Sequence, residues 1–207
     1  KLLLAHEKTK RAEWAQDEMP LYGVFELWGK TLGIVGMGRI GKEVAQRAKP
    51  FGARLIYHDV DRLTPELERS LELTYRSLDE VMAQSDVITI HTPLTPQTTN
   101  LINAERIAKM KPNVIIINVS RGAIVDEAAL AKALKDKRIQ GAGLDVYAEE
   151  PISKTNPLLD APNVILTPHI AGATNESRVR IIDLTIDNVV SMLRGQEPIN
   201  IVNGIKP

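Results

Sequence analysis

The chain has 207 residues, enough for one large α/β domain with a substantial core. Basic and acidic residues number 26 each, and this zero net charge gives no reason to expect a nucleic acid or an anionic membrane as partner. No cysteine is present, which excludes disulfides, thiolate catalysis and cysteine-based metal sites, and no apolar run approaches the ~18 residues of a membrane span. These features predict a soluble cytoplasmic protein without a metal centre.

The first residues read as a helix already under way, since no capping residue and no initiator Met precede them. This predicted helix covers Lys1–Trp14, and we expect the chain to be a fragment of a longer protein. The stretch Asp17–Leu27 follows, with Pro20 and Gly23, and is predicted to be extended. It fits an interface arm and a solvated loop equally well.

Apolar strands then alternate with helices along the rest of the chain. The predicted strands are Leu32–Gly36, Arg54–Tyr57, Val87–Ile90, Val114–Val119, Gly141–Val146 and Val164–Thr167. The predicted helices are Arg39–Pro50, Ser77–Gln84, Ala104–Met110, Asp126–Leu134 and Asn175–Arg194. This alternation predicts a doubly wound parallel sheet, a Rossmann-type dinucleotide-binding domain with flanking connector helices. We expect three parts: a connector helix with a possible dimer arm (1–27), the dinucleotide-binding domain (28–173), and a C-terminal helix and tail (174–207).

Two of these helices carry an apolar face at helical spacing. In the first helix after the opening strand, that face consists of Ile40, Val44, Ala45 and Ala48. In the last helix it consists of Ile182, Ile186, Val189 and Leu193. We expect both faces to be directed towards apolar neighbours.

A glycine motif, Gly36-Met-Gly38-Arg-Ile-Gly41, follows the first strand and opens a helix. This is the context that a dinucleotide-binding turn requires. Gly36 allows the tight turn, Gly38 lets the backbone approach a pyrophosphate, and Gly41 lets the helix pack close to the strand. The helix N-terminus would then offer free N–H groups and a partial positive charge to the phosphates. The alternative is three ordinary turn glycines.

Asp59 ends the second strand, where an acidic side chain can accept hydrogen bonds from the adenosine ribose hydroxyls. A carboxylate there also repels a 2′-phosphate, so the sequence favours NAD over NADP as cofactor. Arg62 lies nearby and could offset this discrimination. An Asp that merely caps a turn is the competing interpretation.

Polar residues follow three further strands, where ligands bind in open α/β sheets. They lie in Asn118–Gly122, Gly143–Pro151 and Thr167–Gly172. Hydride transfer to a 2-oxo acid needs a cation for the substrate, for which Arg is suited, and a proton donor near neutral pKa, for which His is suited. A carboxylate beside the His would orient it and raise its pKa. Each residue also has an ordinary reading as an ion pair, a structural hydrogen bond or an exposed loop.

Five consecutive segments resemble the signatures of the D-isomer-specific 2-hydroxyacid dehydrogenases, a family that includes phosphoglycerate, glycerate/glyoxylate, D-lactate and formate dehydrogenases. The segments are LWGKTLGIVGMGRIG, HTPLTPQTTNLIN, INVSRGAIVDEAAL, GAGLDVYAEEP and LTPHIAGAT. They stand in family order and extend from about Trp14 to about Asn203. The resemblance implies that the protein binds NAD and acts on a small 2-hydroxy or 2-oxo acid.

The resemblance also implies roles for individual residues. Arg121 would bind the substrate, His169 would be the acid/base, and Glu150 would be its carboxylate partner, in preference to Glu149. Asp145 would contact the nicotinamide carboxamide. The other cofactor-lining residues implied are Arg39, Ile40, Thr92, Pro93, Val119, Ser120 and Gly172, with Thr92 and Pro93 near the adenosine; Arg121 and His169 would line the cofactor too.

The chain departs from the family pattern at its N-terminus, because the second domain that family members build largely from N-terminal sequence is missing. Its ending, Ile201–Pro207, resembles the usual family ending, which disfavours the phosphoglycerate dehydrogenases that carry a regulatory domain. Family members are commonly dimers through the dinucleotide-binding domain, so a homodimer is expected by resemblance.

The leading hypothesis is therefore NAD-dependent oxidoreduction of a small D-2-hydroxy acid. Formate oxidation is a rival, but the resemblance implies that those enzymes carry Gln where this chain has Glu150. A different class of function is an NAD(H)-sensing binding protein, like the corepressors of the same fold. A truncated product that binds NAD without catalysis is the third alternative.

Overall fold

A computed structural model describes residues 1–199 of the chain. The tail Ile201–Pro207, whose sequence resembles the family ending, lies outside the described residues. The chain divides into two compact units, Lys1–Leu166 and Thr167–Pro207, and each is described by itself. The predicted division after residues 27 and 173 concerns the protein's domains and stays a prediction.

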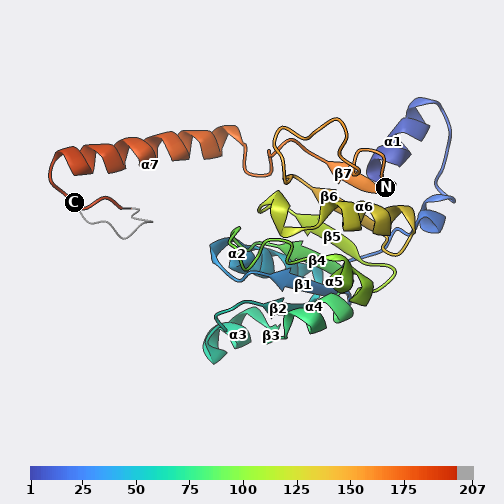
Figure 1. The fold of residues 1–207 in the computed structure, drawn as a ribbon, viewed down its shortest axis with the longest axis horizontal. Coiled ribbons are helices and arrows are strands. Elements are labelled where there is room, and N and C mark those ends of the chain that lie inside the picture. Colours follow the sequence, from blue (N-terminus) through green and yellow to red (C-terminus); the bar gives the residue numbers. More distant parts are fainter. Residues whose placement is uncertain (200–207) are drawn as a thin grey trace. The chain divides into compact units, whose positions relative to one another are not determined.

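The first unit is built on a seven-stranded sheet in the order β3-β2-β1-β4-β5-β6-β7, and every neighbouring pair is parallel (Figure 1). The strands are β1 (Thr31–Val35), β2 (Arg54–His58), β3 (Leu73–Tyr75), β4 (Val87–Ile90), β5 (Ile115–Asn118), β6 (Gly141–Leu144) and β7 (Val164–Leu166). The order reverses between β1 and β4, as in doubly wound sheets. This confirms the predicted Rossmann-type fold.

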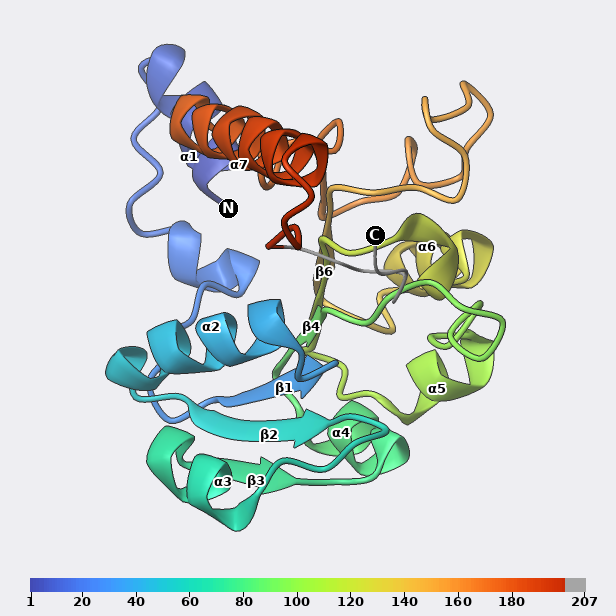
Figure 2. The same ribbon diagram turned by 90° about the vertical axis from the view of Figure 1, so that its left-hand side faces the viewer.

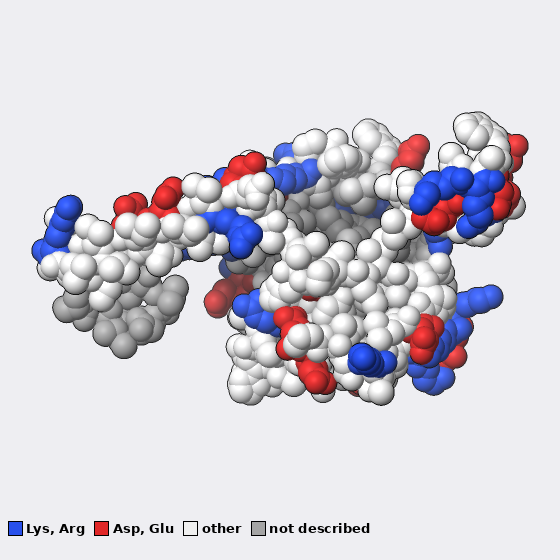
Figure 3. Space-filling model, turned by 90° about the horizontal axis from the view of Figure 1, so that it is seen from above, with Lys and Arg blue, Asp and Glu red and all other residues white. Residues whose placement is uncertain are grey.

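Helices cover both faces of this sheet. They are α1 (Leu2–Lys10), α2 (Arg39–Ala48), α3 (Pro65–Leu71), α4 (Leu78–Gln84), α5 (Ala104–Lys109) and α6 (Glu127–Lys135), with short 3-10 turns at Met19–Tyr22, Lys49–Phe51 and Gly122–Ile124. Figure 2 shows α2 on one face and α5 and α6 on the opposite face. One core lies under α2 against β1 and β2, and a larger one lies under α4, α5 and α6. In the space-filling view, basic and acidic side chains of the described residues are interspersed (Figure 3).

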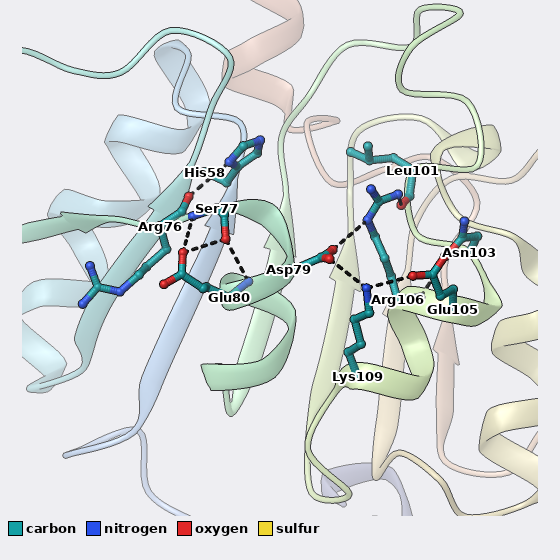
Figure 4. A network of polar contacts seen from close by, with 10 residues as sticks. All are labelled: His58, Arg76, Ser77, Asp79, Glu80, Leu101, Asn103, Glu105, Arg106 and Lys109. Atoms are coloured by element: carbon teal, nitrogen blue, oxygen red, sulfur yellow. Dashed lines mark hydrogen bonds and ion pairs between the residues drawn. The ribbon is translucent and has the colours of Figure 1, made fainter.

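Side-chain caps fix where the helices begin. Ser77 and Glu80 form a capping box at α4, with the Ser77 N–H donating to the Glu80 carboxylate at 2.8 Å. Asp79, in the same first turn of α4, accepts a hydrogen bond from Lys109 of α5 at 2.7 Å and forms an ion pair with Arg106 at 3.4 Å (Figure 4). Because a cap satisfies N–H groups that the helix itself cannot, these contacts set the start of α4 and its place beside α5.

The structure adds two elements that the sequence reading did not include, α3 and β3. Thr64 caps α3, and its hydroxyl accepts the Leu67 N–H at 3.4 Å.

Two predictions about helices need correction. The predicted helix Lys1–Trp14 is shorter than expected, because α1 ends at Lys10 and Ala12 adopts a left-handed φ of 59°. Ile40 was expected on the buried face of α2 but is 64% exposed. It stands in the first turn of the helix, above the end of the sheet.

The second unit contains the long helix α7 (Asn175–Leu193). Thr174 caps it, accepting the Ser177 N–H at 3.0 Å. None of its residues is buried, so its predicted apolar face, represented by Ile182 and Ile186, lies exposed within the described residues. No helix among residues 1–199 combines the length and the low charge that crossing a membrane would need.

The 3-10 turn after β5 packs directly on the loop after β6. A β-carbon added to Gly122 would overlap the carbonyl group and Cα of Tyr147. Tyr147 is itself only 8% exposed and belongs to the larger core. Glycine is therefore required at position 122 by contact between two backbones.

Replacing Gly122 with Ala should lower the free energy of unfolding by about 3 kcal/mol, the upper range for overpacking, because neither backbone can move without disturbing the core. Gly143→Ala is the matched control, since a β-carbon there meets nothing within 4 Å. Urea denaturation of both variants measures the difference. Equal stability of the Gly122→Ala and unmodified proteins would contradict the close approach.

Candidate active site

The glycine turn begins where β1 ends, at the carboxyl edge of the sheet. Gly36 has a φ of 94°, and its N–H donates to the His58 carbonyl at 2.9 Å. A β-carbon on Gly36 would lie 2.7 Å from both the His91 carbonyl carbon and the Thr92 nitrogen. The conformation and the space thus both require glycine, and the turn packs on the chain that leaves β4.

The start of α2 leaves open space at the middle glycine of the motif. Gly41 packs so closely that an added β-carbon would overlap the Gly36 carbonyl. Gly38 is the N-cap of α2, has no side-chain cap, and an added β-carbon would meet nothing within 4 Å. Helices α3 to α7, in contrast, all have a side-chain cap. The first N–H groups of α2 therefore remain available to a phosphate.

Asp59 is held at the end of β2 by two backbone groups. Its carboxylate accepts the Met37 N–H and, through Oδ1, the Asp61 N–H at 3.1 Å. The first contact ties the carboxylate to the glycine turn, and the second ties it to the loop after β2. Asp59 is thereby fixed beside Gly36–Gly41 with acceptor capacity left for ribose hydroxyls.

Thr92 and Pro93 follow β4 next to the glycine turn. The Thr92 hydroxyl oxygen is buried and has no hydrogen-bond partner among the described residues. The Pro93 carbonyl accepts the Thr98 hydroxyl at 2.7 Å, which holds the loop that follows. A buried orphan hydroxyl and the open space at Gly38 both fit a bound dinucleotide, since each is a place where ligand atoms would complete the packing.

His91 is a residue that the sequence reading missed. Its imidazole Nε2 lies 2.9 Å from the Thr89 hydroxyl, and burial lowers its pKa, which keeps the ring neutral at pH 7. Its backbone N–H donates to the Val35 carbonyl at 2.7 Å. The backbone contact on Gly36 could not be found from spacing, because it depends on β4 lying beside β1.

Asn118 organises the turn that carries Arg121, which is another role missed from sequence. Only 1% of Asn118 is exposed. Its side-chain oxygen accepts the Ser120 N–H at 3.1 Å, and its amide donates to the Arg121 carbonyl at 2.9 Å. The Arg121 side chain is exposed, and its guanidinium donates to the Ser120 carbonyl at 2.6 Å. The sequence did give one signal for this role, because Asn118 is a polar residue at the end of the apolar run VIIIN.

The Tyr147 backbone is where the Arg121 turn meets the loop that carries the predicted carboxylate. Gly122 packs on it from one side, and the Glu150 carboxylate accepts the Tyr147 N–H at 3.0 Å. Asp145, two residues earlier, is 3% exposed, and its N–H donates to the Asn118 carbonyl at 3.0 Å. The structure therefore brings the turns carrying Arg121, Asp145 and Glu150 together at one edge.

His169 and Gly172 belong to the second unit. His169 has a left-handed φ of 54°, and its N–H donates to the Thr167 carbonyl at 3.1 Å. The Gly172 carbonyl accepts the Ser177 hydroxyl at 2.6 Å, which joins this loop to α7. Within its own unit, His169 thus occupies an ordered loop in an uncommon backbone conformation. Its pairing with Glu150 stays a prediction.

Comparison with known proteins places this geometry in context. The family model for the D-isomer specific 2-hydroxyacid dehydrogenase NAD binding domain matches residues 1–171. The glyoxylate reductase of Aeropyrum pernix is 47% identical over 185 residues, which is 89% of this chain and 55% of that protein.

Solved structures agree with this similarity. A D-lactate dehydrogenase from Aquifex aeolicus, complexed with NAD and lactic acid, has a TM-score of 0.85 at 36% identity, with 94% of this chain and 62% of that chain covered. A formate dehydrogenase from Granulicella has a TM-score of 0.91 at 28% identity, with 99% and 56% covered. The chain thus spans less than two thirds of the length of these similar proteins.

Two glycines of the motif should separate cofactor binding from stability. Gly38→Ala should leave the melting temperature unchanged and weaken NADH binding at least tenfold, because the β-carbon enters open space that a pyrophosphate would fill (a loss of about 1.4 kcal/mol). Gly41→Ala should lower the melting temperature, because its β-carbon overlaps the Gly36 carbonyl. Calorimetric titration and thermal denaturation measure both. Undiminished NADH binding by Gly38→Ala would exclude this turn as the cofactor site.

Proposed function

The chain belongs to the D-isomer-specific 2-hydroxyacid dehydrogenase family, as its NAD-binding domain, and we propose that the protein is an oxidoreductase that interconverts small D-2-hydroxy acids and their 2-oxo acids. The observation that carries this proposal is the junction at Tyr147, which gathers an arginine turn and a carboxylate at the edge that carries the glycine motif. The proposed substrates are small acids of the glyoxylate, hydroxypyruvate and glycerate type, because each carries a carboxylate that an arginine can bind.

Arg121 is proposed to bind the substrate. Its guanidinium can hold a carboxylate through two parallel hydrogen bonds and polarise the adjacent carbonyl. The Asn118 side chain supports this role, because its bonds to Ser120 and Arg121 fix the backbone from which the guanidinium extends. The exposed side chain leaves the guanidinium accessible to an acid that approaches the sheet edge.

His169 is proposed to deliver and accept the substrate proton, with Glu150 as the partner that orients it. Bound NADH would supply the hydride for reduction of the 2-oxo acid. Asp145, Val119 and Ser120 are proposed to line the nicotinamide end, with Gly172 leaving room for the ring. Asp59, Thr92 and Pro93 are proposed to hold the adenosine end, and Arg39 and Ile40 the pyrophosphate.

A homodimer is also proposed, formed through the N-terminal segment, residues 1–27. Three of its apolar side chains are largely exposed: Trp14 (79%), Leu21 (85%) and Val24 (55%). A groove of about 590 Å³ lies between this segment and strands β5 to β7, with Ile115, Ile117 and Val164 among its lining residues. A second copy of the chain would cover apolar surface of this extent.

The cytoplasm is proposed as the location, since a chain without cysteine suits a reducing compartment.

Replacing His169 with Ala in the full-length protein should lower kcat for 2-oxo acid reduction by ~10²–10⁴, the range for loss of general acid catalysis. The Kd for NADH should be nearly unchanged. Steady-state assays with glyoxylate and hydroxypyruvate measure the first value, and fluorescence titration measures the second. Wild-type turnover by this variant would refute the assignment. Tight NADH binding by the unmodified protein without turnover of any 2-oxo acid would favour the NAD(H)-sensing alternative.

Glu150→Gln should lower kcat/KM for reduction of the 2-oxo acid by roughly tenfold or more, because a hydrogen bond to a charged group is worth about 1.5–3 kcal/mol and the neutral amide cannot replace the carboxylate beside His169. Glu149→Gln is the matched control one residue away and should keep the wild-type value. Steady-state assays of both variants in the full-length protein measure the difference. A loss in Glu149→Gln alone would reassign the partner.

A further inference from the structure

The loop after β2 carries a cation close to the proposed adenosine site. Arg62 stands three residues after Asp59, whose carboxylate is fixed between the glycine turn and this loop. An arginine at this point could bind a 2′-phosphate and so admit NADP(H). Whether it does so depends on where its guanidinium is held.

Glu68 of α3 holds the Arg62 guanidinium by two parallel hydrogen bonds. The Nε and Nη2 atoms donate to the two carboxylate oxygens, each at 2.9 Å. The guanidinium carbon also lies 5.3 Å from the centre of the Tyr75 ring, on β3. This bidentate pairing engages two of the five guanidinium N–H donors, holds the group on α3, and offsets the charge that would attract a phosphate.

The carboxylate is the fixed member of the pair. Only 13% of the Glu68 side chain is exposed, against 62% of Arg62. The hydroxyl of the fully buried Tyr57 donates to Glu68 at 2.8 Å and accepts the Leu63 N–H at 2.9 Å, next to Arg62. The hydrogen bonds from Arg62 and, second, from Tyr57 lower the pKa of Glu68 to about 2, so the carboxylate is ionised at every pH of interest. Arg62 is thus tied through Glu68 and Tyr57 to the core of β2.

We propose that Glu68 is a specificity-determining residue, which keeps the Arg62 guanidinium on α3 and away from Asp59 and thereby preserves the selection of NAD(H) against its 2′-phosphorylated form. The inference rests on the proposed cofactor site at Gly36–Gly41 and Asp59. Discrimination then has two parts. Asp59 repels the 2′-phosphate, and Glu68 withholds the nearby cation that would compensate for it.

The test is the ratio of the Kd values for NADPH and NADH, measured by calorimetry at low salt. Glu68→Gln keeps an oxygen for Tyr57 and removes the charge that binds Arg62. We expect it to tighten NADPH binding roughly five- to tenfold, the scale of one added charge–phosphate contact near the surface, with NADH binding changed less than twofold. The double variant Arg62→Ala/Glu68→Gln should lose that gain.

Glu66→Gln is the matched control. Glu66 lies on the same helix and pairs with Arg69 at 3.2 Å, so its replacement removes an equal charge without releasing Arg62. It should leave the ratio unchanged. An equal shift in Glu66→Gln, or no shift in Glu68→Gln while both variants still bind NADH, would overturn the inference. Absence of NADH binding by the unmodified protein would instead overturn the cofactor site on which it rests.

A further variant keeps the inference testable if Glu68→Gln does not fold. Arg62→Leu removes the cation while the remaining chain is unchanged. If Glu68 already withholds Arg62, NADPH affinity in this variant should stay within twofold of that of the unmodified protein. A loss of fivefold or more would show that Arg62 already serves the 2′-phosphate, and would refute the role of Glu68.

Discussion

Backbone packed directly on backbone, with no side chain between, is the constraint on which the carboxyl edge of this sheet depends. Two of these contacts are Gly41 against the Gly36 carbonyl and Gly122 against Tyr147. The first contact brings the N-terminus of α2 down to the end of β1. The second brings the Arg121 turn onto the loop that carries Asp145 and Glu150. The residues proposed to bind the cofactor and the substrate can share one edge because these two pairs of backbones touch.

The charged groups along this edge are each held in place by specific contacts. Asp59 is fixed by backbone N–H groups, and Arg62 is paired with Glu68 of α3. The uncapped start of α2 then supplies the positive end of a helix dipole where the proposed pyrophosphate lies. A negative charge at the ribose and a partial positive charge at the phosphates together describe a site suited to NAD.

Much of the fold could be predicted from sequence because its signals are local. The run VIIIN marks a strand, and Gly36–Gly41 marks a strand-turn-helix. The run also suggests burial on both faces, but β5 is fully buried on one face only, since Ile115 and Ile117 line the groove beside the N-terminal residues. Helix α3 and strand β3 were missed because each is short. β3, with only three residues, exists mainly because β2 offers it a partner. Ile40 was misplaced because helical spacing cannot tell a face that meets the sheet from one that extends beyond its edge.

The site was predictable as a set of turns but not as a set of contacts. Spacing placed Arg121, Asp145 and Glu150 after strands, and parallel order sends those ends to one edge. The contacts that join the turns run through Asn118, His91 and Tyr147, and of these only Asn118 gave a signal in the sequence, as a polar residue at the end of an apolar strand. These contacts form because particular strands are neighbours in the sheet, and the order of the strands cannot be read from a single sequence.

Calorimetric titration of the unmodified protein with NADH and then with NADPH shows directly whether this edge selects NAD over NADP. Because Asp59 is fixed beside the glycine turn and Arg62 is already paired, we expect saturable binding of one NADH per chain and at least tenfold weaker binding of NADPH (about 1.4 kcal/mol of discrimination). Equal affinity for the two cofactors, or no binding of either, would contradict this expectation.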